Sequence, residues 1–563
     1  MKRKLRSNLE PGTTQWAVRR AQWRALGLTD ADMEKPKIAI VNTSSGLSSC
    51  FAHLDVIAER LKTAIKAAGG WPFEVRTTAP SDFVTSAGKG GRYILPSRDL
   101  IANDIEAAVE GAQLDGMICL ASCDKTAPGQ LMAAARLDIP SIVLACGYQP
   151  SGIYAGERVD IEDAFESVGR YVTGAIDLDH LTGLCDSAIR GPGVCSGMGT
   201  ANSMHVVAEA LGMALPGTTP VLANSAAMWD AAGRAGRRIV EMVWEDARPR
   251  AIMTAAAFAN AVKVVLAVSA SINTIRHLQA IAVEAQCPVD LYALLEEHGR
   301  RVPLLCAVRP NGAHTIEQFE AAGGTVAVMR ELAPLLDGGA CTVTGDTVSD
   351  NLARARPADG AIIRTLDRPL STTPALVVLR GTLTPGGGIV KVGTGAQHKL
   401  KFEGVANVYE SQQAALEGLK RGDIRPGQVV VLRGMGPKGG PGVALASGFV
   451  AALDGAGLDE TVAVVTDGQL SGLNRGLAVG QVSPEAAEGG PLALVASGDR
   501  IRIDIHARSC NLDVPETELA QRRAQLAAWT GADERGWLAV YRQVVQPLAR
   551  GAVLFDSAAN GKR

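Results

Sequence analysis

Short apolar runs alternate with helical patterns in the first quarter of the chain, and this alternation most constrains the fold. The apolar runs lie at residues 37–41, 114–120 and 141–145, and the helical patterns lie at residues 54–68 and 130–137. β-branched runs separated by helix-length segments are typical of parallel strands joined by crossover helices. The sequence therefore predicts an α/β protein whose N-terminal domain is doubly wound.

A further helix is expected after Ser97. Ser97 precedes an apolar-periodic run at residues 100–109. Serine is a good N-cap because its hydroxyl accepts a hydrogen bond from a free backbone amide of the first helical turn. We expect this helix to begin just after Ser97.

The pattern changes beyond about residue 365, where short apolar runs are cut by Gly and Pro turns. This arrangement predicts a β-rich domain. The runs lie at residues 375–379, 388–392, 428–432, 461–465 and 500–505. A chain of 563 residues also exceeds what one hydrophobic core serves, since cores stop growing beyond about 250–300 residues. We place the boundary in the polar stretch 354–370 and predict domains at 1–360 and 361–563.

Composition favours a small-molecule partner. The formal net charge is −2, with 47% hydrophobic and 20% charged residues, so neither disorder nor a nucleic-acid-binding surface is indicated. The basic N-terminus is not followed by the apolar segment of a secretory signal, which predicts a cytoplasmic protein. The most membrane-like stretch, residues 251–272, is interrupted by Asn260 and Lys263, so we expect a buried helix and no membrane partner.

Three of the ten cysteines stand in unusual settings. Cys50 and Cys123 each follow a predicted strand through a polar turn, and Cys195 lies in the glycine-rich stretch 191–202 that opens a helix. No pair has CxxC spacing, so neither a zinc ribbon nor a thioredoxin-type motif is indicated. From spacing alone, three separate core cysteines are favoured over one shared three-thiolate site.

The run Cys123-Asp124-Lys125 sets a soft ligand, a hard ligand and an amine side by side after an apolar run. Strand ends in open α/β sheets are where ligands bind, because loops there present side chains without disturbing the packed sheet. The run therefore predicts a ligand site.

Taken together, the motifs resemble the dihydroxy-acid dehydratase and 6-phosphogluconate dehydratase family, which includes sugar-acid dehydratases. The resemblance runs nearly end to end. The matching positions are Asn42 with Cys50 and His53, Ser81-Asp82, 93–98, 123–129, 195–202, 209–217, Ser271-Ile272-Asn273 with His277, 343–345, 436–442, 466–468, Ser471-Gly472 and 482–487.

The resemblance implies a fold and two cofactors. It implies an N-terminal α/β domain, a C-terminal β-barrel-like domain and a site in the cleft between them. It also implies a [2Fe–2S] cluster held by Cys50, Cys123 and Cys195, although the sequence itself leaves [4Fe–4S] open. Mg²⁺ would be held by Asp82, Asp124 and a carbamylated Lys125, because carbamylation turns an ammonium into an anionic oxygen donor.

The resemblance also implies the reaction and the assembly. Ser471 would be the base that removes the C2 proton of a 2,3-dihydroxy carboxylate, whose enol product becomes a 2-keto acid. Without the resemblance, Ser471 would be read as a turn residue and the aspartates as turn or capping residues. Relatives of this kind are homodimers or larger, so we expect a homodimer or homotetramer.

Departures from the family pattern affect the C-terminal half of the site. Leu445 stands where the family has a metal-binding Glu, and an alkyl group cannot bind Mg²⁺. Gln469 stands where the family usually has Arg, and Thr382 where it tends to have Asn. These changes keep a non-catalytic homologue open as an alternative.

Two further alternatives concern the ligand. Asp82 and the stretch 93–98 favour the dihydroxy-acid branch, with an aldonate or other sugar acid as the second substrate class. Residues 434–439 spell GxGxxG after a predicted strand, which is the pattern of a dinucleotide-binding loop. Pro437 and Lys438 within that turn count against a dinucleotide.

Overall fold

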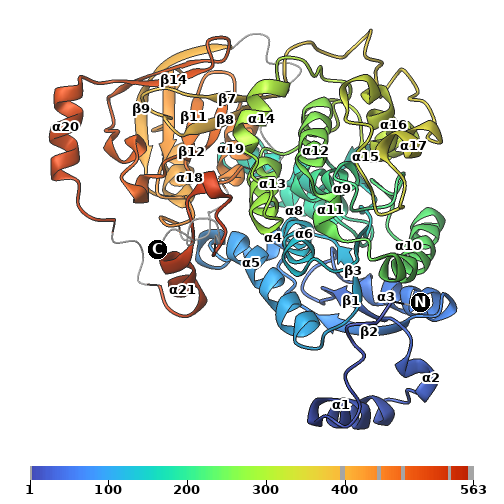
Figure 1. Ribbon diagram of the computed structural model, residues 1–563. Helices are drawn as coiled ribbons and strands as arrows, with labels where there is room; N and C mark the ends of the chain where they lie inside the picture. The colour runs from blue at the N-terminus through green and yellow to red at the C-terminus, as the bar shows by residue number, and fades with distance from the viewer. Residues whose placement is uncertain (1–2, 393–399, 441–445, 471–475, 530–533, 556–563) are drawn as a thin grey trace.

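The computed structural model describes residues 3–392, 400–440, 446–470, 476–529 and 534–555. Figure 1 shows a helix-rich N-terminal part beside a C-terminal part built on a large sheet. The predicted positions Ser471 and Leu445 lie outside the described residues. The predicted division at residues 360 and 361 falls between helix α17 (Val348–Ala353) and strand β7 (Leu376–Leu379).

The N-terminal part contains a parallel sheet of strand order β2-β1-β3-β4. Its strands are β1 (Lys37–Asn42), β2 (Trp71–Arg76), β3 (Gly116–Ala121) and β4 (Ser141–Ala145). Strands β1, β3 and β4 are buried along their whole length, as expected where helices cover both faces. The strand order reverses direction at β1, so the α/β class and the doubly wound arrangement are confirmed.

Helices cover both faces of this sheet. Helix α3 (Leu54–Ala67) packs with α10 (Ala226–Glu245), and α5 (Ile94–Ile105) packs with α6 (Thr126–Leu137). Helix α3 connects β1 to β2 and α6 connects β3 to β4, and these connections run in opposite directions along the sheet. Right-handed crossovers therefore place the two helices on opposite faces.

The start predicted for helix α5 is wrong. The helix begins at Ile94, and Ser97 lies inside its first turn, where its hydroxyl donates to the carbonyl of Ile94 at 2.6 Å. Tyr93 occupies the N-cap without a side-chain cap. Ser97 therefore bonds backward within the turn instead of capping the helix.

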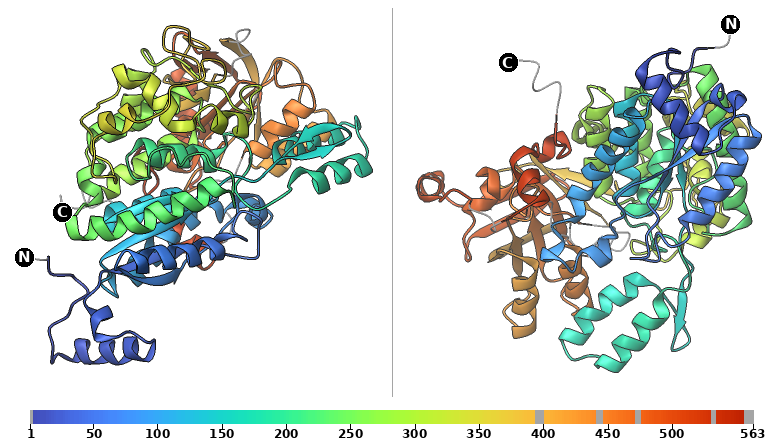
Figure 2. Two further views of the ribbon diagram at one scale, coloured as in Figure 1. Left: turned by 90° about the vertical axis from the view of Figure 1, so that its right-hand side faces the viewer. Right: turned by 90° about the horizontal axis from the view of Figure 1, so that it is seen from below.

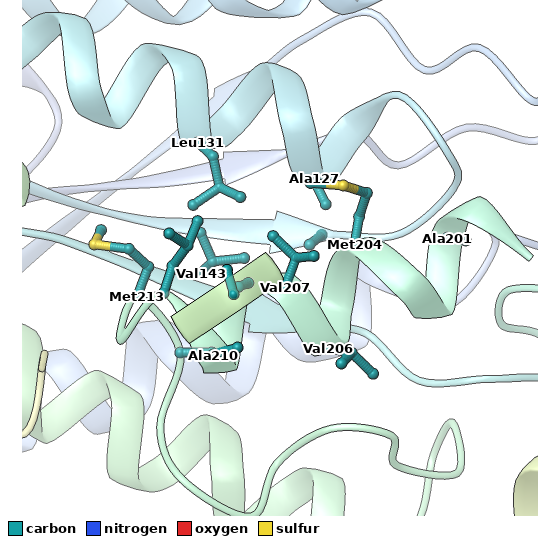
Figure 3. Packing of buried hydrophobic residues seen from close by; sticks show 14 of the residues in the cluster. Ala127, Leu131, Val143, Ala201, Met204, Val206, Val207, Ala210 and Met213 are labelled. Atoms are coloured by element: carbon teal, nitrogen blue, oxygen red, sulfur yellow. The ribbon is translucent and has the colours of Figure 1, made fainter. Parts of the chain in front are cut away.

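A second helical layer packs over the sheet. It contains α9 (Thr200–Ala210), α12 (Ala255–Ala267) and α13 (Asn273–Glu284). Figure 3 shows Met204 of α9 next to Ala127 of α6, within the contact between these two helices. Helix α12 is the buried helix predicted for the membrane-like stretch, and none of the described helices is long and apolar enough to cross a membrane.

The remaining helices of the N-terminal part surround this core. They are α1 (Thr14–Ala25), α2 (Asp30–Met33), α4 (Asp82–Thr85), α7 (Ile161–Val172), α8 (Leu178–Ala188), α11 (Pro249–Ile252), α14 (Leu291–His298), α15 (Ile316–Ala321) and α16 (Gly324–Glu331). The hairpin β5 (Gly152–Tyr154) and β6 (Glu157–Val159) precedes α7. Figure 2 shows α7, α8 and this hairpin, drawn in teal, standing out from the N-terminal part.

The C-terminal part is an eight-stranded, nearly closed sheet of order β14-β13-β9-β10-β11-β12-β8-β7. Its other strands are β8 (Gly387–Lys391), β9 (Lys401–Tyr409), β10 (Gln428–Leu432), β11 (Ala463–Thr466), β12 (Ala478–Ser483), β13 (Arg500–Asp504) and β14 (Ser509–Asp513). Arg380, just after β7, forms a bridge with Ser509 of β14, which brings the two edge strands together. The predicted β-barrel-like domain is confirmed.

The middle of this sheet is parallel. Strands β9, β10, β11 and β12 run in parallel, with α18 (Gln412–Arg421) and α19 (Ser447–Gly455) on the connections. Helices α20 (Glu516–Gln525) and α21 (Trp537–Val544) follow the last strand. The apolar interior is a separate core of buried side chains such as Val377, Val390, Val431 and Val465.

The two parts meet where helices α7 and α19 cross. A Cβ atom added to Gly169 of α7 would lie 2.1 Å from the carbonyl oxygen of Ala452 in α19. A Cβ atom added to Gly455 would likewise lie 2.1 Å from the carbonyl oxygen of Glu166. Only glycine allows the backbones this approach, so the crossing depends on both residues.

We expect Gly169→Ala to lower the free energy of unfolding by about 1–3 kcal/mol, because the new methyl group forces α7 away from α19. Gly233→Ala is a matched control within α10, since the nearest atom to its added Cβ is the Arg237 guanidinium at 3.7 Å. Alanine there should stabilise the protein by up to about 1 kcal/mol. Differential scanning calorimetry of both variants tests this, and equal transition temperatures would contradict it.

Candidate functional site

The three singled-out cysteines converge. Cys50 and Cys123 are buried, and their thiols lie close enough to change each other's pKa. That contact lowers the pKa of Cys50 and, together with burial, raises the pKa of Cys123 well above its ordinary value. Burial, followed by the charge of Cys50, also raises the pKa of Cys195. Three thiols so close cannot all ionise unless a positive group joins them.

The fold explains this convergence. Strands β1 and β3 pair in parallel, so the turns after them lie at one edge of the sheet, and these turns carry Cys50 and Cys123. Cys195 arrives on the loop before α9, where Asn202 donates to the carbonyls of Cys195 and Gly197, both at 2.8 Å.

The other seven cysteines are all free thiols, like these three. They are Cys119, Cys146, Cys306 and Cys510, which are buried, Cys287, which is half-buried, and Cys185 and Cys341, which are exposed.

The structure also brings together the predicted carboxylates and the lysine. Lys125 Nζ donates to Asp82 Oδ2 at 2.8 Å, and Asp124 Oδ2 lies 3.9 Å from the same nitrogen. The side chains of Lys125 and Asp82 are 0% and 3% exposed. Burial, assisted by Asp124 and opposed by Lys125, raises the pKa of Asp82 to about 8. Asp82 Oδ1 is buried without a hydrogen-bond partner among the described residues.

Asp124 links the two groups, because its negative charge opposes ionisation of all three thiols: it adds to the raised pKa values of Cys123 and Cys195 and acts against the lowered pKa of Cys50. Thiols and carboxylate oxygens therefore lie within one electrostatic environment. Soft and hard donors side by side are what a sulfur-bound iron centre and a neighbouring Mg²⁺ require. As they stand, the described side chains contain no group of three or more His, Cys, Asp and Glu arranged to hold one metal ion.

The donor chemistry nevertheless fits the implied cofactors. The clustered thiols need a positive partner, and the buried Asp82 Oδ1 needs a further contact. A metal centre beside these residues would supply both.

Helix α13 joins the site to the C-terminal part. Asn273 donates to Thr200 Oγ1 at 3.0 Å, which connects α13 to the start of α9. From strand β12, Gln481 donates to Asn273 Oδ1 at 3.2 Å and to the carbonyl of Ile272 at 3.1 Å. This network fixes the barrel against the loop that carries Cys195.

Arg98 and His277 were not assigned roles from the sequence, although both lie within matching motifs. Arg98 is fully buried and donates to the carbonyls of Gly551 and Ala552 at 2.9 and 2.7 Å. It also lies 3.4 Å from His277 Nδ1. Burial, then the charges of Lys125 and Arg98, lowers the pKa of His277 well below its ordinary value, so its ring is neutral.

The GxGxxG stretch forms a turn that encloses carboxylates of the protein itself. The amides of Gly434 and Met435 donate to Asp467 at 3.1 and 2.9 Å, and those of Lys438 and Gly439 donate to Glu485, each at 2.9 Å. A dinucleotide pyrophosphate would need such amides free. The structure therefore argues against the dinucleotide alternative.

The positions that depart from the family fall in different surroundings. Gln469 is fully buried, and its amide nitrogen and oxygen have no hydrogen-bond partner in the described chain. The backbone carbonyl of Gln469 accepts from the backbone amide of Ala446 at 3.0 Å. Thr382 instead accepts from the amide of Leu512 at 2.9 Å, so it supports barrel closure next to β14.

Comparison with known proteins gives full-length matches. The family described as Dihydroxy-acid/6-phosphogluconate dehydratase N-terminal matches residues 35–351, and the corresponding C-terminal family matches residues 361–552. A protein of Nitratidesulfovibrio vulgaris named dihydroxy-acid dehydratase is 42% identical over 97% of this chain and 98% of its own length. Proteins of the same name from Moorella thermoacetica and Ignicoccus hospitalis are 42% and 40% identical, each over 96% of this chain and 98% of their own length.

The N-terminal family match covers the converging cysteines and the Asp82–Lys125 pair, and the C-terminal match covers the barrel. The relatives match nearly the whole chain. The chain belongs to the dihydroxy-acid/6-phosphogluconate dehydratase family.

Proposed function

We propose that this protein is a hydro-lyase that converts a 2,3-dihydroxy carboxylic acid into a 2-keto acid and water. The observation that carries the proposal is the convergence of Cys50, Cys123 and Cys195 with Asp82, Asp124 and Lys125 at one edge of the parallel sheet. Relatives named dihydroxy-acid dehydratase match nearly the whole chain, which favours this substrate class over the sugar acids.

The reaction balances without an oxidant or reductant. A base removes the proton from C2, the C3–O bond breaks, and the leaving hydroxide takes up a proton from the protonated base and departs as water. The resulting enol loses its O–H proton and gains one at C3, which gives the 2-keto acid. We propose Ser471 as the base, on the strength of the family motif.

The same residues would hold the cofactors. We propose that Cys50, Cys123 and Cys195 bind a [2Fe–2S] cluster, and that Asp82, Asp124 and carbamylated Lys125 bind Mg²⁺. When bound, such a cluster supplies a Lewis acid for the leaving hydroxyl, and Mg²⁺ supplies a hard cation for substrate oxygens. We further propose a cytoplasmic homodimer or homotetramer.

Turnover is the direct test. Purified anaerobically and supplied with Mg²⁺, the protein should form 2-keto acids from short 2,3-dihydroxy acids, with kcat/KM about tenfold or more above that for aldonates. A coupled 2-keto-acid assay over both panels measures this. Preference for an aldonate would move the protein to the sugar-acid branch.

A protein that binds iron and sulfide but turns over no acid would instead indicate a homologue with an altered metal site. The Leu445→Glu variant, which restores the carboxylate of the family pattern, tests whether the missing metal ligand explains such a loss of turnover. Turnover gained by Leu445→Glu would locate the defect at the metal site.

Replacing any of Cys50, Cys123 or Cys195 with serine should remove most of the iron and sulfide and the visible absorption, because an alcohol is a poor ligand for iron in a cluster. Cys341→Ser changes an exposed cysteine and should leave the iron content unchanged. Retention of iron in all three site variants would refute the cysteine assignment. The ratio of iron to protein in the unchanged chain separates [2Fe–2S] from [4Fe–4S].

Magnesium affinity should depend on bicarbonate. An uncarbamylated Lys125 ammonium, bonded to Asp82 at 2.8 Å, repels a divalent cation and uses one of its ligands. Removing CO₂ and bicarbonate should therefore weaken Mg²⁺ binding about tenfold or more, as measured by isothermal titration calorimetry. Lys125→Met should bind Mg²⁺ weakly in either condition, and a bicarbonate effect that persists in this variant would exclude Lys125 as its origin.

A further inference from the structure

The backbone carbonyls of the three converging cysteines share one feature. Each carbonyl oxygen accepts a hydrogen bond from a buried polar side chain of another residue. The three bonds run from Ser122 Oγ to Cys50 at 2.5 Å, from Thr126 Oγ1 to Cys123 at 2.9 Å, and from Asn202 Nδ2 to Cys195 at 2.8 Å. Ser122, Thr126 and Asn202, called the carbonyl donors below, are at most 2% exposed.

The bond made by Ser122 joins two different turns. Ser122 follows the last residue of β3, and the residue to which it donates, Cys50, lies 72 positions earlier, in the turn after β1. Other buried serine hydroxyls bond back within their own turn, as Ser97 does to Ile94 and Ser141 does to Ile139. The Ser122 bond therefore fixes the turn that carries Cys50 relative to the turn that follows β3.

Thr126 closes the turn that carries Cys123. Its hydroxyl accepts from the amide of Ser122 at 2.8 Å while it donates to the carbonyl of Cys123. The Thr126 amide donates to the same carbonyl, also at 2.9 Å. Because Ser122 belongs to this closed turn, the backbone of Cys123 and the backbone of Cys50 are held in one hydrogen-bonded unit.

The third loop is held in a similar way. Asn202 Nδ2 donates to the carbonyl of Gly197 at 2.8 Å as well as to that of Cys195, so one side chain spans this part of the loop. The same loop is bonded to the turn after β1, since the amide of Gly193 donates to the carbonyl of Ser49 at 3.2 Å. The turn after β1 thus accepts hydrogen bonds from both of the other cysteine segments.

Cysteines outside the site are held differently. The carbonyls of Cys287 and Cys510 accept from backbone amides. The carbonyl of Cys146 does contact a side chain, His53 Nε2, at 2.6 Å. His53 lies three residues after Cys50, however, so this bond also holds the turn that carries a site cysteine.

Fixing the backbone of a cysteine limits where its sulfur can lie. Once the backbone is held, rotation about χ1 is the freedom that remains, and χ1 is restricted to three staggered positions. Thiols must lose their protons to bind a metal, and like charges that lie close together repel each other. Hydrogen bonds between the turns would resist this repulsion and keep the sulfurs together until a metal compensates their charge.

We infer that the carbonyl donors Ser122, Thr126 and Asn202 are positioning residues, which hold the backbones of Cys50, Cys123 and Cys195 so that the thiols are arranged for a metal centre before it binds. This inference rests on the proposed function, because that function supplies the metal centre. The carbonyl donors act through the cysteines and need not touch the substrate. Residues that orient metal ligands in this way typically change metal affinity about 10- to 100-fold.

Retention of iron tests the inference. Ser122→Ala and Thr126→Val each remove one hydroxyl, and each should shorten the half-life of bound iron and of the visible absorption in the presence of a chelator about tenfold or more. Thr126→Ser keeps the hydroxyl and should retain iron as the unchanged protein does. Ser141→Ala is the matched control, since Ser141 is fully buried at the start of β4 and its hydroxyl donates to the carbonyl of Ile139 at 2.6 Å.

Ser141→Ala removes the same kind of bond at the opposite edge of the sheet and should leave iron retention unchanged. If Ser122→Ala and Ser141→Ala lower the unfolding temperature equally and both retain iron, Ser122 only stabilises the fold and the inference is overturned.

A titration of the metal-free protein with Cd²⁺, followed by ultraviolet thiolate absorption, gives a second readout, because this soft ion binds thiolates without a cluster. Ser122→Ala and Thr126→Val should raise the Kd for Cd²⁺ about tenfold or more above that of the unchanged protein and of Ser141→Ala. An equal Kd in all four proteins would overturn the inference. The expected Cd²⁺ difference in a protein that contains no iron and sulfide as purified would retain the positioning role and refute the proposed cluster instead.

Discussion

Parallel pairing of β1 and β3 is the constraint on which the candidate site depends. Because parallel strands end at the same edge of a sheet, the turns after β1 and β3 emerge side by side. Those turns carry Cys50 and the run from Cys123 to Lys125. An antiparallel arrangement would place the two turns at opposite edges, and no short loop could then reunite the thiols.

Burial of charge is the second organising element. The Lys125–Asp82 pair lies almost entirely out of water, and removing one partner of such a pair typically costs about 3–5 kcal/mol. The barrel adds buried acids that are held by backbone amides, Asp467 and Glu485. The protein thus keeps several ionisable side chains out of water on both sides of the junction between its parts, a feature that is frequent at functional sites.

Much of the local structure could be predicted from sequence. Continuous apolar runs located β1, β3 and β4, and Gly/Pro turns located the short strands of the barrel, because both signals are local. Glycine-rich and polar turns likewise marked Cys50, Cys123 and Cys195. The family motifs, and not the spacing, joined these cysteines into one site.

Other features depend on contacts between distant residues and left no local signal. The Ser97 pattern fitted a cap, yet the helix starts one turn earlier. Thr382 was noted only as a departure from the family pattern, and its contact with Leu512 of β14 is seen only in the structure. The close approach of Gly169 and Gly455 likewise depends on the packing of α7 against α19, which brings distant parts of the chain together.

The bonds of Arg98 have a consequence for biosynthesis. The buried Arg98 guanidinium donates to the carbonyls of Gly551 and Ala552. These residues lie 453 and 454 positions after Arg98 in the chain. At about 5–20 residues per second, a ribosome needs on the order of half a minute or more to translate that interval. Throughout that time the carbonyl partners of Arg98 are missing, so the surroundings of this buried guanidinium reach their final packing only when translation is almost finished.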